Sequence, residues 1–301
     1  LRPTPISNTV FGKVLHDAGI SYSFQSMSDF ASAPPSSDKL LLISGHNEYW
    51  TKTMQDSLAA FILGGGNVLN LSGNVMWWRI NLHKNSIMQD QLGGLRPKEC
   101  NALVPQEYSG TGQSGFHIKP GGESLVGVNY RFAGLAISSI GVLPDDQKRI
   151  YNFTPEIADR GAVLEILEPE HPFFANISLE NDRYLAADRY LIGDEIDGVP
   201  LLRGALNPAY ESFFPENIKY LGKTVTAAAN WVSGKGGAYY QKLVEPAIVV
   251  ETRPFDEEGG TVLSFGSIGI AYALYRGDKI TAKLVRNGVQ YLRSLRRPVA
   301  D

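Results

Sequence analysis

The sequence predicts an α/β protein built on a doubly wound, mostly parallel sheet, with a second half that is rich in β-strands. The unbroken apolar run over residues 39–44 is typical of a strand that is buried on both faces. A helical pattern over residues 51–66 and a strand pattern over residues 67–73 follow it, and together they predict a βαβ unit with a right-handed crossover. Short β patterns separated by turns then dominate the second half.

Each predicted element has its own local pattern. Residues 7–19 carry apolar side chains at helical spacing, and the helix over 51–66 has a stripe formed by Met54, Leu58, Phe61 and Ile62. Near the C-terminus, two apolar segments at 246–252 and 260–268 flank an acidic turn and predict a β-hairpin. The last helix is predicted over 278–295, with Asp278 as its N-cap.

Length and composition limit the classes of function. The chain of 301 residues predicts a single α/β domain with a loop-rich and β-rich excursion at about 82–245. A net charge of −3, without long runs of one sign, gives no indication of nucleic-acid or membrane partners. No apolar run has the roughly 18–20 residues that a membrane helix needs. We therefore expect a soluble protein. A single cysteine, Cys100, excludes an internal disulfide, which favours the cytoplasm.

Two polar segments follow the two strands of the predicted βαβ unit. Ligands of open α/β sheets bind outside the carboxyl ends of the strands, and parallel neighbours bring these ends to one edge. The side chains that we expect to line one cleft there are His46, Glu48, Tyr49, Asn74 and Arg79, walled by Trp50, Trp77 and Trp78. Two structural alternatives stay open, because Glu48 or Thr51 can cap the following helix and the tryptophans can simply cover the sheet edge.

Several familiar chemistries are disfavoured by the sequence. The glycine-rich phosphate-binding motifs are absent from both turns, and Ser72 lacks the glycine frame of a nucleophile elbow. The five histidines show no close pair of metal-ligand spacing, and His16 and His171 are interpreted as structural residues. Carboxylate and phenol oxygens remain, and such hard ligands suit a hard ion, with phenolate suited to ferric iron.

The segment "GHNEYWT", followed by a helix and "GGGNVLNLSGNVMWWRI", resembles the large (beta) subunit of N,N-dimethylformamidase and its relatives. The segments "AIVVETRPFDEEGGTVLSFGSIGIAYAL" and "GTGQSGFHIKPGGESLVGVNY" are similar to later parts of that family, in the same order. The resemblance implies a core like that of class I glutamine amidotransferases without their cysteine. It also implies a mononuclear iron, held by two tyrosines and a glutamate, that hydrolyses a small amide.

Carried over residue by residue, the resemblance implies that Tyr49 is a metal ligand and Glu251 a catalytic base or orienting group. Glu48 or Glu251 would take a proton from water, and Asn74 or His46 would donate to the developing oxyanion. The chain differs from the family pattern at four positions. Asn47 replaces an aspartate and Gln113 a glutamate, for which Glu107 or Glu123 are substitutes; Thr4 stands where a tyrosine motif would end, and Ile270 stands where tryptophan is usual.

Three hypotheses of function follow. The first is an iron-dependent hydrolase of small linear amides. The second is a non-catalytic or carbohydrate-binding module, because a cleft with three tryptophans can hold sugars by stacking. The third is a subunit of a homo- or hetero-oligomer whose site is completed by a partner chain.

Overall fold

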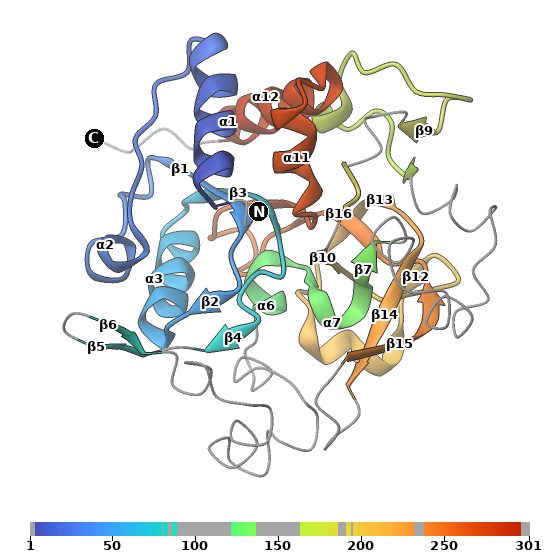
Figure 1. The fold of residues 1–301 in the computed structure, drawn as a ribbon, viewed down its shortest axis with the longest axis horizontal. Helices are drawn as coiled ribbons and strands as arrows, with labels where there is room; N and C mark the ends of the chain where they lie inside the picture. Colours follow the sequence, from blue (N-terminus) through green and yellow to red (C-terminus); the bar gives the residue numbers. More distant parts are fainter. Residues whose placement is uncertain are drawn as a thin grey trace.

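The computed structural model describes residues 4–79, 81–83, 86–88, 122–136, 163–185, 191–193, 195–231 and 238–295 (Figure 1). The α-helices are α1 (Thr4–Asp17), α2 (Met27–Ser32), α3 (Lys52–Leu63), α6 (Glu123–Val126), α7 (Tyr130–Ala133), α11 (Gly269–Tyr275) and α12 (Lys279–Ser294). Two 3₁₀ helices are η3 (Pro172–Phe174) and η4 (Pro208–Phe213).

The strands form one large sheet and several smaller ones. The large sheet has seven strands in the order β1 (Leu40–His46), β3 (Asn67–Gly73), β17 (Val262–Phe265), β16 (Ala247–Thr252), β13 (Lys219–Lys223), β8 (Leu164–Ile166) and β9 (Tyr184–Leu185). A four-stranded sheet has the order β10 (Glu195–Gly198), β7 (Gly134–Ala136), β14 (Thr226–Trp231) and β15 (Ala238–Val244). Two-stranded pairs are β2 (Tyr49–Trp50) with β4 (Trp78–Arg79), β5 (Asn81–His83) with β6 (Ser86–Met88), and β11 (Leu201–Leu202) with β12 (Ala205–Leu206).

The mixed direction of the large sheet corrects the prediction of a mostly parallel one. β1, β3 and β17 run parallel to one another, whereas β16, β13, β8 and β9 are joined by antiparallel pairing. Three of these strands, β8, β9 and β13, come from the excursion predicted at about 82–245. A short strand pattern in the sequence does not specify its partner or its direction, so the return of these strands to the main sheet was not predictable.

The predicted βαβ unit is confirmed. β1 pairs in parallel with β3, and α3 connects them. Thr51 is the N-cap of α3, since its Oγ1 accepts a hydrogen bond of 3.0 Å from the backbone N–H of Met54. The helix therefore has its cap without Glu48, and one structural alternative for that carboxylate is removed.

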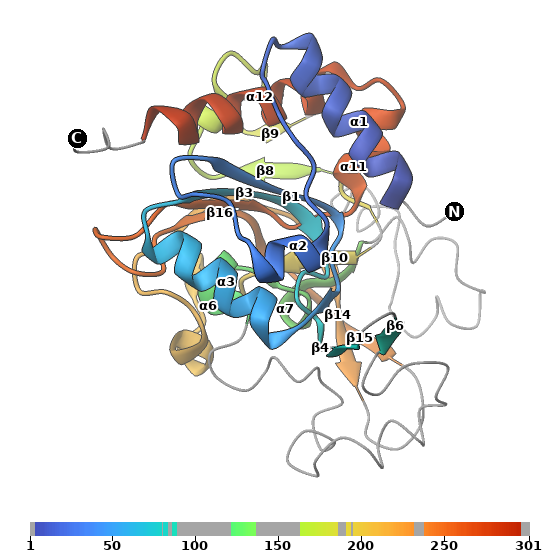
Figure 2. The same cartoon turned by 90° about the vertical axis from the view of Figure 1, so that its left-hand side faces the viewer.

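Helices cover the two faces of the large sheet (Figure 2). α1, α11 and α12 pack on one face, where Phe11, Ile270 and Leu284 belong to one buried cluster. α2, α3 and α6 lie on the opposite face around a second buried cluster that includes Phe30 and Leu58. This three-layer arrangement confirms the α/β class and leaves the strand ends as the places where polar side chains can gather.

The two predicted C-terminal elements are also confirmed. β16 and β17 form an antiparallel hairpin around residues 253–261. Asp278 is the N-cap of α12, with Oδ2 accepting a 2.9 Å hydrogen bond from the backbone N–H of Thr281. Among the residues that the structure describes, no helix is both long and apolar enough to span a membrane.

Candidate active site

The two polar strand ends meet, as the sequence predicts. Tyr49 pairs with Trp78 and Trp50 with Arg79 in the short parallel sheet of β2 and β4. The backbone carbonyl of Asn47 accepts hydrogen bonds from the N–H of Met76 at 3.0 Å and from Trp50 Nε1 at 2.8 Å. The loop after β1 and the turn after β3 are therefore joined through the backbone of Asn47.

A histidine lies between two carboxylates at the end of β1. His46 Nε2 is 3.1 Å from Glu48 Oε2 and 2.8 Å from Glu195 Oε2. One N–H cannot point at both oxygens, and among the described residues Nε2 makes no hydrogen bond of good geometry, so these contacts are ion pairs held mainly by charge. We call His46, Glu48 and Glu195 the acid–histidine cluster.

The charge state of His46 follows from these neighbours. Burial disfavours the imidazolium, but the contacts with Glu195 and Glu48 outweigh it and raise the pKa of His46 to about 10. At neutral pH the ring is therefore protonated and cannot accept a proton. The cluster then holds one cation and two carboxylates, so it has more hydrogen-bond acceptors than donors.

Glu195 reaches this cluster from β10, a strand of the four-stranded sheet. Register places His46 beside Gly73, and a Cβ on Gly73 would lie 2.3 Å from the carbonyl oxygen of Glu195. A Cβ on Gly266, which follows β17, would lie equally close, 2.3 Å, to the carbonyl oxygen of Asp197. Only glycine at these two positions allows β10 to lie across the ends of β3 and β17.

Asp197 holds the turn that follows β3. Its Oδ1 accepts a hydrogen bond from the backbone N–H of Asn74 at 2.7 Å, and its Oδ2 accepts one from Val75 at 2.8 Å. Burial of this carboxyl raises its pKa to about 8, against the lowering effect of the two hydrogen bonds. Asn74 itself is 2% exposed, and among the described residues its Oδ1 has no hydrogen-bond partner.

Tyr49, the predicted metal ligand, lies beside the acid–histidine cluster. It is half-buried, and its ring is edge-on to the ring of His46 with centroids 6.5 Å apart. Within the described ranges, no group of three or more histidine, cysteine, aspartate or glutamate side chains is placed to hold a metal ion. Of the positions in the ligand set that the family resemblance implies, Tyr49 lies in the described residues, whereas Gln113, at the expected position of the glutamate, lies outside them.

Several other residues that the sequence singles out are buried on helices or lie outside the described ranges. Glu107, Gln113 and Cys100 lie outside the described residues. Glu123, on α6, is buried and accepts a 2.9 Å hydrogen bond from Asn129 Nδ2. Ile270 is buried on α11.

The predicted tryptophan walls are largely inside the protein. Trp50 is buried edge-on to Phe30, and Trp77 is buried edge-on to Tyr130. Both rings are therefore packed inside the protein, and neither presents a face on which a sugar could stack. The strand that contains Trp78 and Arg79 is described, but the side chains of these two residues are not. A substrate contact for the four residues stays a prediction.

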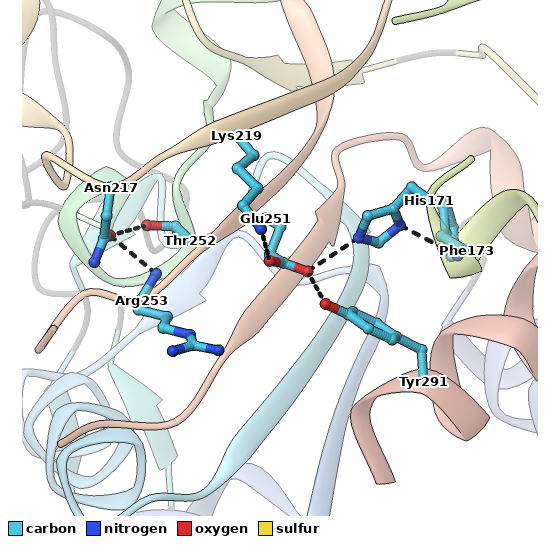
Figure 3. A network of polar contacts seen from close by, with 8 residues as sticks. All are labelled: His171, Phe173, Asn217, Lys219, Glu251, Thr252, Arg253 and Tyr291. Carbon is cyan, nitrogen blue, oxygen red and sulfur yellow. Dashed lines mark hydrogen bonds and ion pairs between the residues drawn. The ribbon is translucent and has the colours of Figure 1, made fainter. Parts of the chain in front are cut away.

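Glu251 belongs to a different network. Its register partner is Leu263, near the start of β17, whose partner on β3 is Leu69, so Glu251 lies toward the amino ends of the parallel strands, away from the carboxyl ends that carry His46. Figure 3 shows that its carboxylate faces His171, Tyr291 and Lys219. We call these four residues the Glu251 network. The structure therefore does not bring Glu251 together with the acid–histidine cluster.

Three donors occupy the buried carboxylate of Glu251. Tyr291 Oη donates to Oε2 at 2.6 Å, and Lys219 Nζ donates to Oε1 at 3.1 Å. His171 Nδ1 accepts the backbone N–H of Phe173 at 3.2 Å, so the ring proton is on Nε2, 3.1 Å from Oε2. Although burial acts in the opposite direction, these contacts lower the pKa of Glu251 to about 2. Burial and the neighbouring Glu251 raise the pKa of Tyr291 above its ordinary range.

Sequence reasoning did not find Glu195, Asp197 or the partners of Glu251. Glu195 and Asp197 alternate in "EIDG", a pattern that places both side chains on one face of a strand. That alternation is a usable signal, but four residues are too few to indicate where the strand lies. His171 was assigned a structural role, and its position as the cap of η3 and partner of Glu251 is consistent with that interpretation.

The fold and this site describe an α/β protein with a charged cluster at the carboxyl ends of parallel strands. The family model for the N,N-dimethylformamidase beta subunit-like, C-terminal family matches residues 4–281. The chain therefore belongs to this family, and the resemblance of its sequence motifs is confirmed. A search of curated proteins found no match to the chain.

Proposed function

We propose that the protein hydrolyses the C–N bond of a small amide at the acid–histidine cluster. The observation that carries this proposal is the position of His46 between Glu48 and Glu195, at the carboxyl end of β1, in a member of an N,N-dimethylformamidase-like family. Open α/β sheets bind their ligands at this edge.

Glu48 is the proposed general base. Thr51 caps α3, so the carboxylate of Glu48 is not needed for capping, and it lies 3.1 Å from the ring of His46. It would take a proton from the attacking water as the C–O bond forms, and return it to the nitrogen as the C–N bond breaks. His46 is protonated and would act through its positive charge on the developing oxyanion.

Asn74 is the proposed hydrogen-bond partner of the substrate. Its side chain is buried at the end of β3, and its backbone is held in place by Asp197. A carboxamide can donate through Nδ2 to a carbonyl oxygen and accept through Oδ1 from an amide N–H. Both groups are present in a primary or secondary amide.

Tyr49 is the proposed ligand of the iron ion that the family resemblance implies. When bound, such an ion would polarise the amide carbonyl and lower the pKa of its water. Among the described residues, Tyr49 would contribute a phenolate oxygen to such an ion. Metal analysis of the purified protein, and an iron–phenolate absorption band that is lost in Tyr49→Phe, would support Tyr49 as a ligand.

The family is described by a beta subunit, so we also propose that the chain functions in an oligomer. Light scattering of the purified protein, alone and in the presence of chains that co-purify with it, measures this directly. A monomer with full amidase activity would contradict the need for a partner.

The function is tested by release of ammonia from formamide and acetamide, and of dimethylamine from N,N-dimethylformamide, with and without added ferrous or ferric iron. We expect hydrolysis by the wild-type protein and its loss in Glu48→Gln. If a folded protein releases neither ammonia nor dimethylamine under any of these conditions, the proposal is overturned.

A further inference from the structure

The turn after β3 has an unfavourable backbone conformation. Asn74 and Met76 both have φ of 55°, in the left-handed region that residues other than glycine rarely adopt. Such residues persist where the surrounding structure holds them, and they are concentrated at functional sites.

Groups outside the turn hold three successive backbone N–H groups. Those of Asn74 and Val75 donate to the two oxygens of Asp197, and that of Met76 donates to the carbonyl of Asn47. Asp197 is 0% exposed. Because the two oxygens of one buried carboxyl group accept these two N–H groups, Asp197 fixes the direction of the backbone at Asn74 and Val75.

The strand that carries Asp197 is itself fixed closely against the large sheet. The backbone N–H of Asp197 donates to the carbonyl of Gly266 at 2.9 Å, and that of Ile268 donates to the carbonyl of Glu195 at 3.3 Å. The close approaches at Gly73 and Gly266 bring the backbone of β10 directly against the ends of β3 and β17. Asp197 is therefore a rigid support for the turn.

We propose that Asp197 is a positioning residue of the candidate active site, which acts through Asn74. Its carboxyl group holds the backbone of Asn74 and Val75 and so fixes the buried carboxamide of Asn74 relative to Glu48 and His46. The role in positioning rests on the proposed function, because Asn74 is the group that would bind the amide. Small displacements of such a group lower reaction rates strongly.

The test uses Asp197→Asn, Asn74→Gly and the double variant. Asparagine keeps the size of aspartate but puts an N–H₂ against a backbone N–H, so one of the two hydrogen bonds is lost. Glycine at position 74 adopts positive φ without strain but removes the carboxamide. Asp278→Asn is the matched control, because Asp278 also accepts two backbone N–H groups, from Ile280 and Thr281, at the start of α12.

Hydrogen exchange and protein stability test, without any substrate, whether Asp197 holds the backbone of Asn74 and Val75. In Asp197→Asn, exchange of the Asn74 and Val75 amides should rise on the order of tenfold, relative to amides elsewhere in β3. The loss of stability from Asp197→Asn should be smaller in the Asn74→Gly background, whereas that from Asp278→Asn should be the same in both backgrounds. If exchange of the Asn74 and Val75 amides is unchanged, or if the effects of the Asp197 and Asn74 substitutions on stability are additive, Asp197 does not hold this turn. If Asp197→Asn does not fold by itself, its loss of stability in the Asn74→Gly background still tests whether Asp197 holds the turn.

Kinetics test the positioning role. Asp197→Asn should lower kcat with little change in KM, and the double variant should be no slower than Asn74→Gly. Asp278→Asn should lower stability without lowering kcat. An Asp197→Asn enzyme with wild-type kcat would show that Asp197 only stabilises the fold. A wild-type protein that hydrolyses no amide would contradict the proposed function alone, because the exchange and stability results still decide whether Asp197 holds the turn.

Discussion

The acid–histidine cluster and the Glu251 network differ in their ratio of carboxylates to donor groups. In the first, one imidazolium lies between two carboxylates, and the pKa of His46 is raised to about 10. In the second, one carboxylate receives three donors, and the pKa of Glu251 is lowered to about 2. A cluster with two carboxylates and one cation can accept a proton from a substrate or a water, whereas a carboxylate that already accepts from three donors is suited to joining elements of the fold.

The Glu251 network has the position of such a structural joint. Glu251 lies on β16, Lys219 on the neighbouring β13, Tyr291 on α12, and His171 caps η3 (Figure 3). One carboxylate thus connects the sheet with the helical layer above it. The acid–histidine cluster instead connects two sheets at an edge, where ligands of α/β proteins bind.

The largest expected effect separates the two carboxylates by activity. Glu48→Gln should lower kcat by a factor on the order of 10² to 10⁴, the usual contribution of a general base. Glu251→Gln should lower stability and leave kcat unchanged. Amide hydrolysis and thermal unfolding of both variants measure this. A large fall in kcat in Glu251→Gln would restore the sequence-based hypothesis that Glu251 is the base.

The second prediction concerns the charge on His46. An NMR titration should give a midpoint near pH 10 rather than 6.5. Because its pKa is raised by folding, its contribution to stability is complete below pH 6.5 and is lost as the pH rises through 10. Glu195→Gln, which removes the closer carboxylate charge, should lower the midpoint. A wild-type midpoint near 6.5 is the result that would contradict the ion-paired cluster.

The third prediction concerns acid stability. The pKa of Glu251 is lowered from 4.5 to about 2, so its contribution is present above pH 4.5 and is lost as the pH falls toward 2. That difference corresponds to roughly 3 kcal/mol. Urea unfolding between pH 6 and pH 2 measures it, and Glu251→Gln is the control, since its stability should fall less over this range. Parallel curves for the two proteins would contradict the network's role.

The smallest expected effects rank the donors to Glu251. Tyr291→Phe removes a hydroxyl that donates to a buried carboxylate at 2.6 Å and should cost about 2 kcal/mol. Lys219→Ala should cost less than about 1 kcal/mol, because the lysine side chain is 65% exposed and solvent screens its charge. Denaturant unfolding of both variants gives the ranking, which a larger loss in Lys219→Ala would reverse.

Much of the fold could be predicted because its signals are local. The stripe of Met54 and Leu58, the N-caps Thr51 and Asp278, and the apolar strand before His46 each follow from a few neighbouring residues. The meeting of the two strand ends then followed from the rule that a βαβ unit is parallel. The sheet that each strand between residues 82 and 245 joins was harder to predict, because the sequences of short strands such as β8 and β13 do not indicate their partners.

The sequence by itself determined the βαβ unit, the C-terminal hairpin and the presence of polar chemistry after Ser44 and Ser72. Tertiary structure decided which of those side chains work together. Glu195 and Asp197 reach the strand ends from a strand more than a hundred residues further along the chain, through close approaches that only Gly73 and Gly266 allow. The antiparallel direction of β16 brings Glu251, which the family resemblance links to the site, toward the amino ends of the parallel strands, at the opposite end from His46. Contacts between distant segments depend on the packing of the whole core, and no local pattern encodes them.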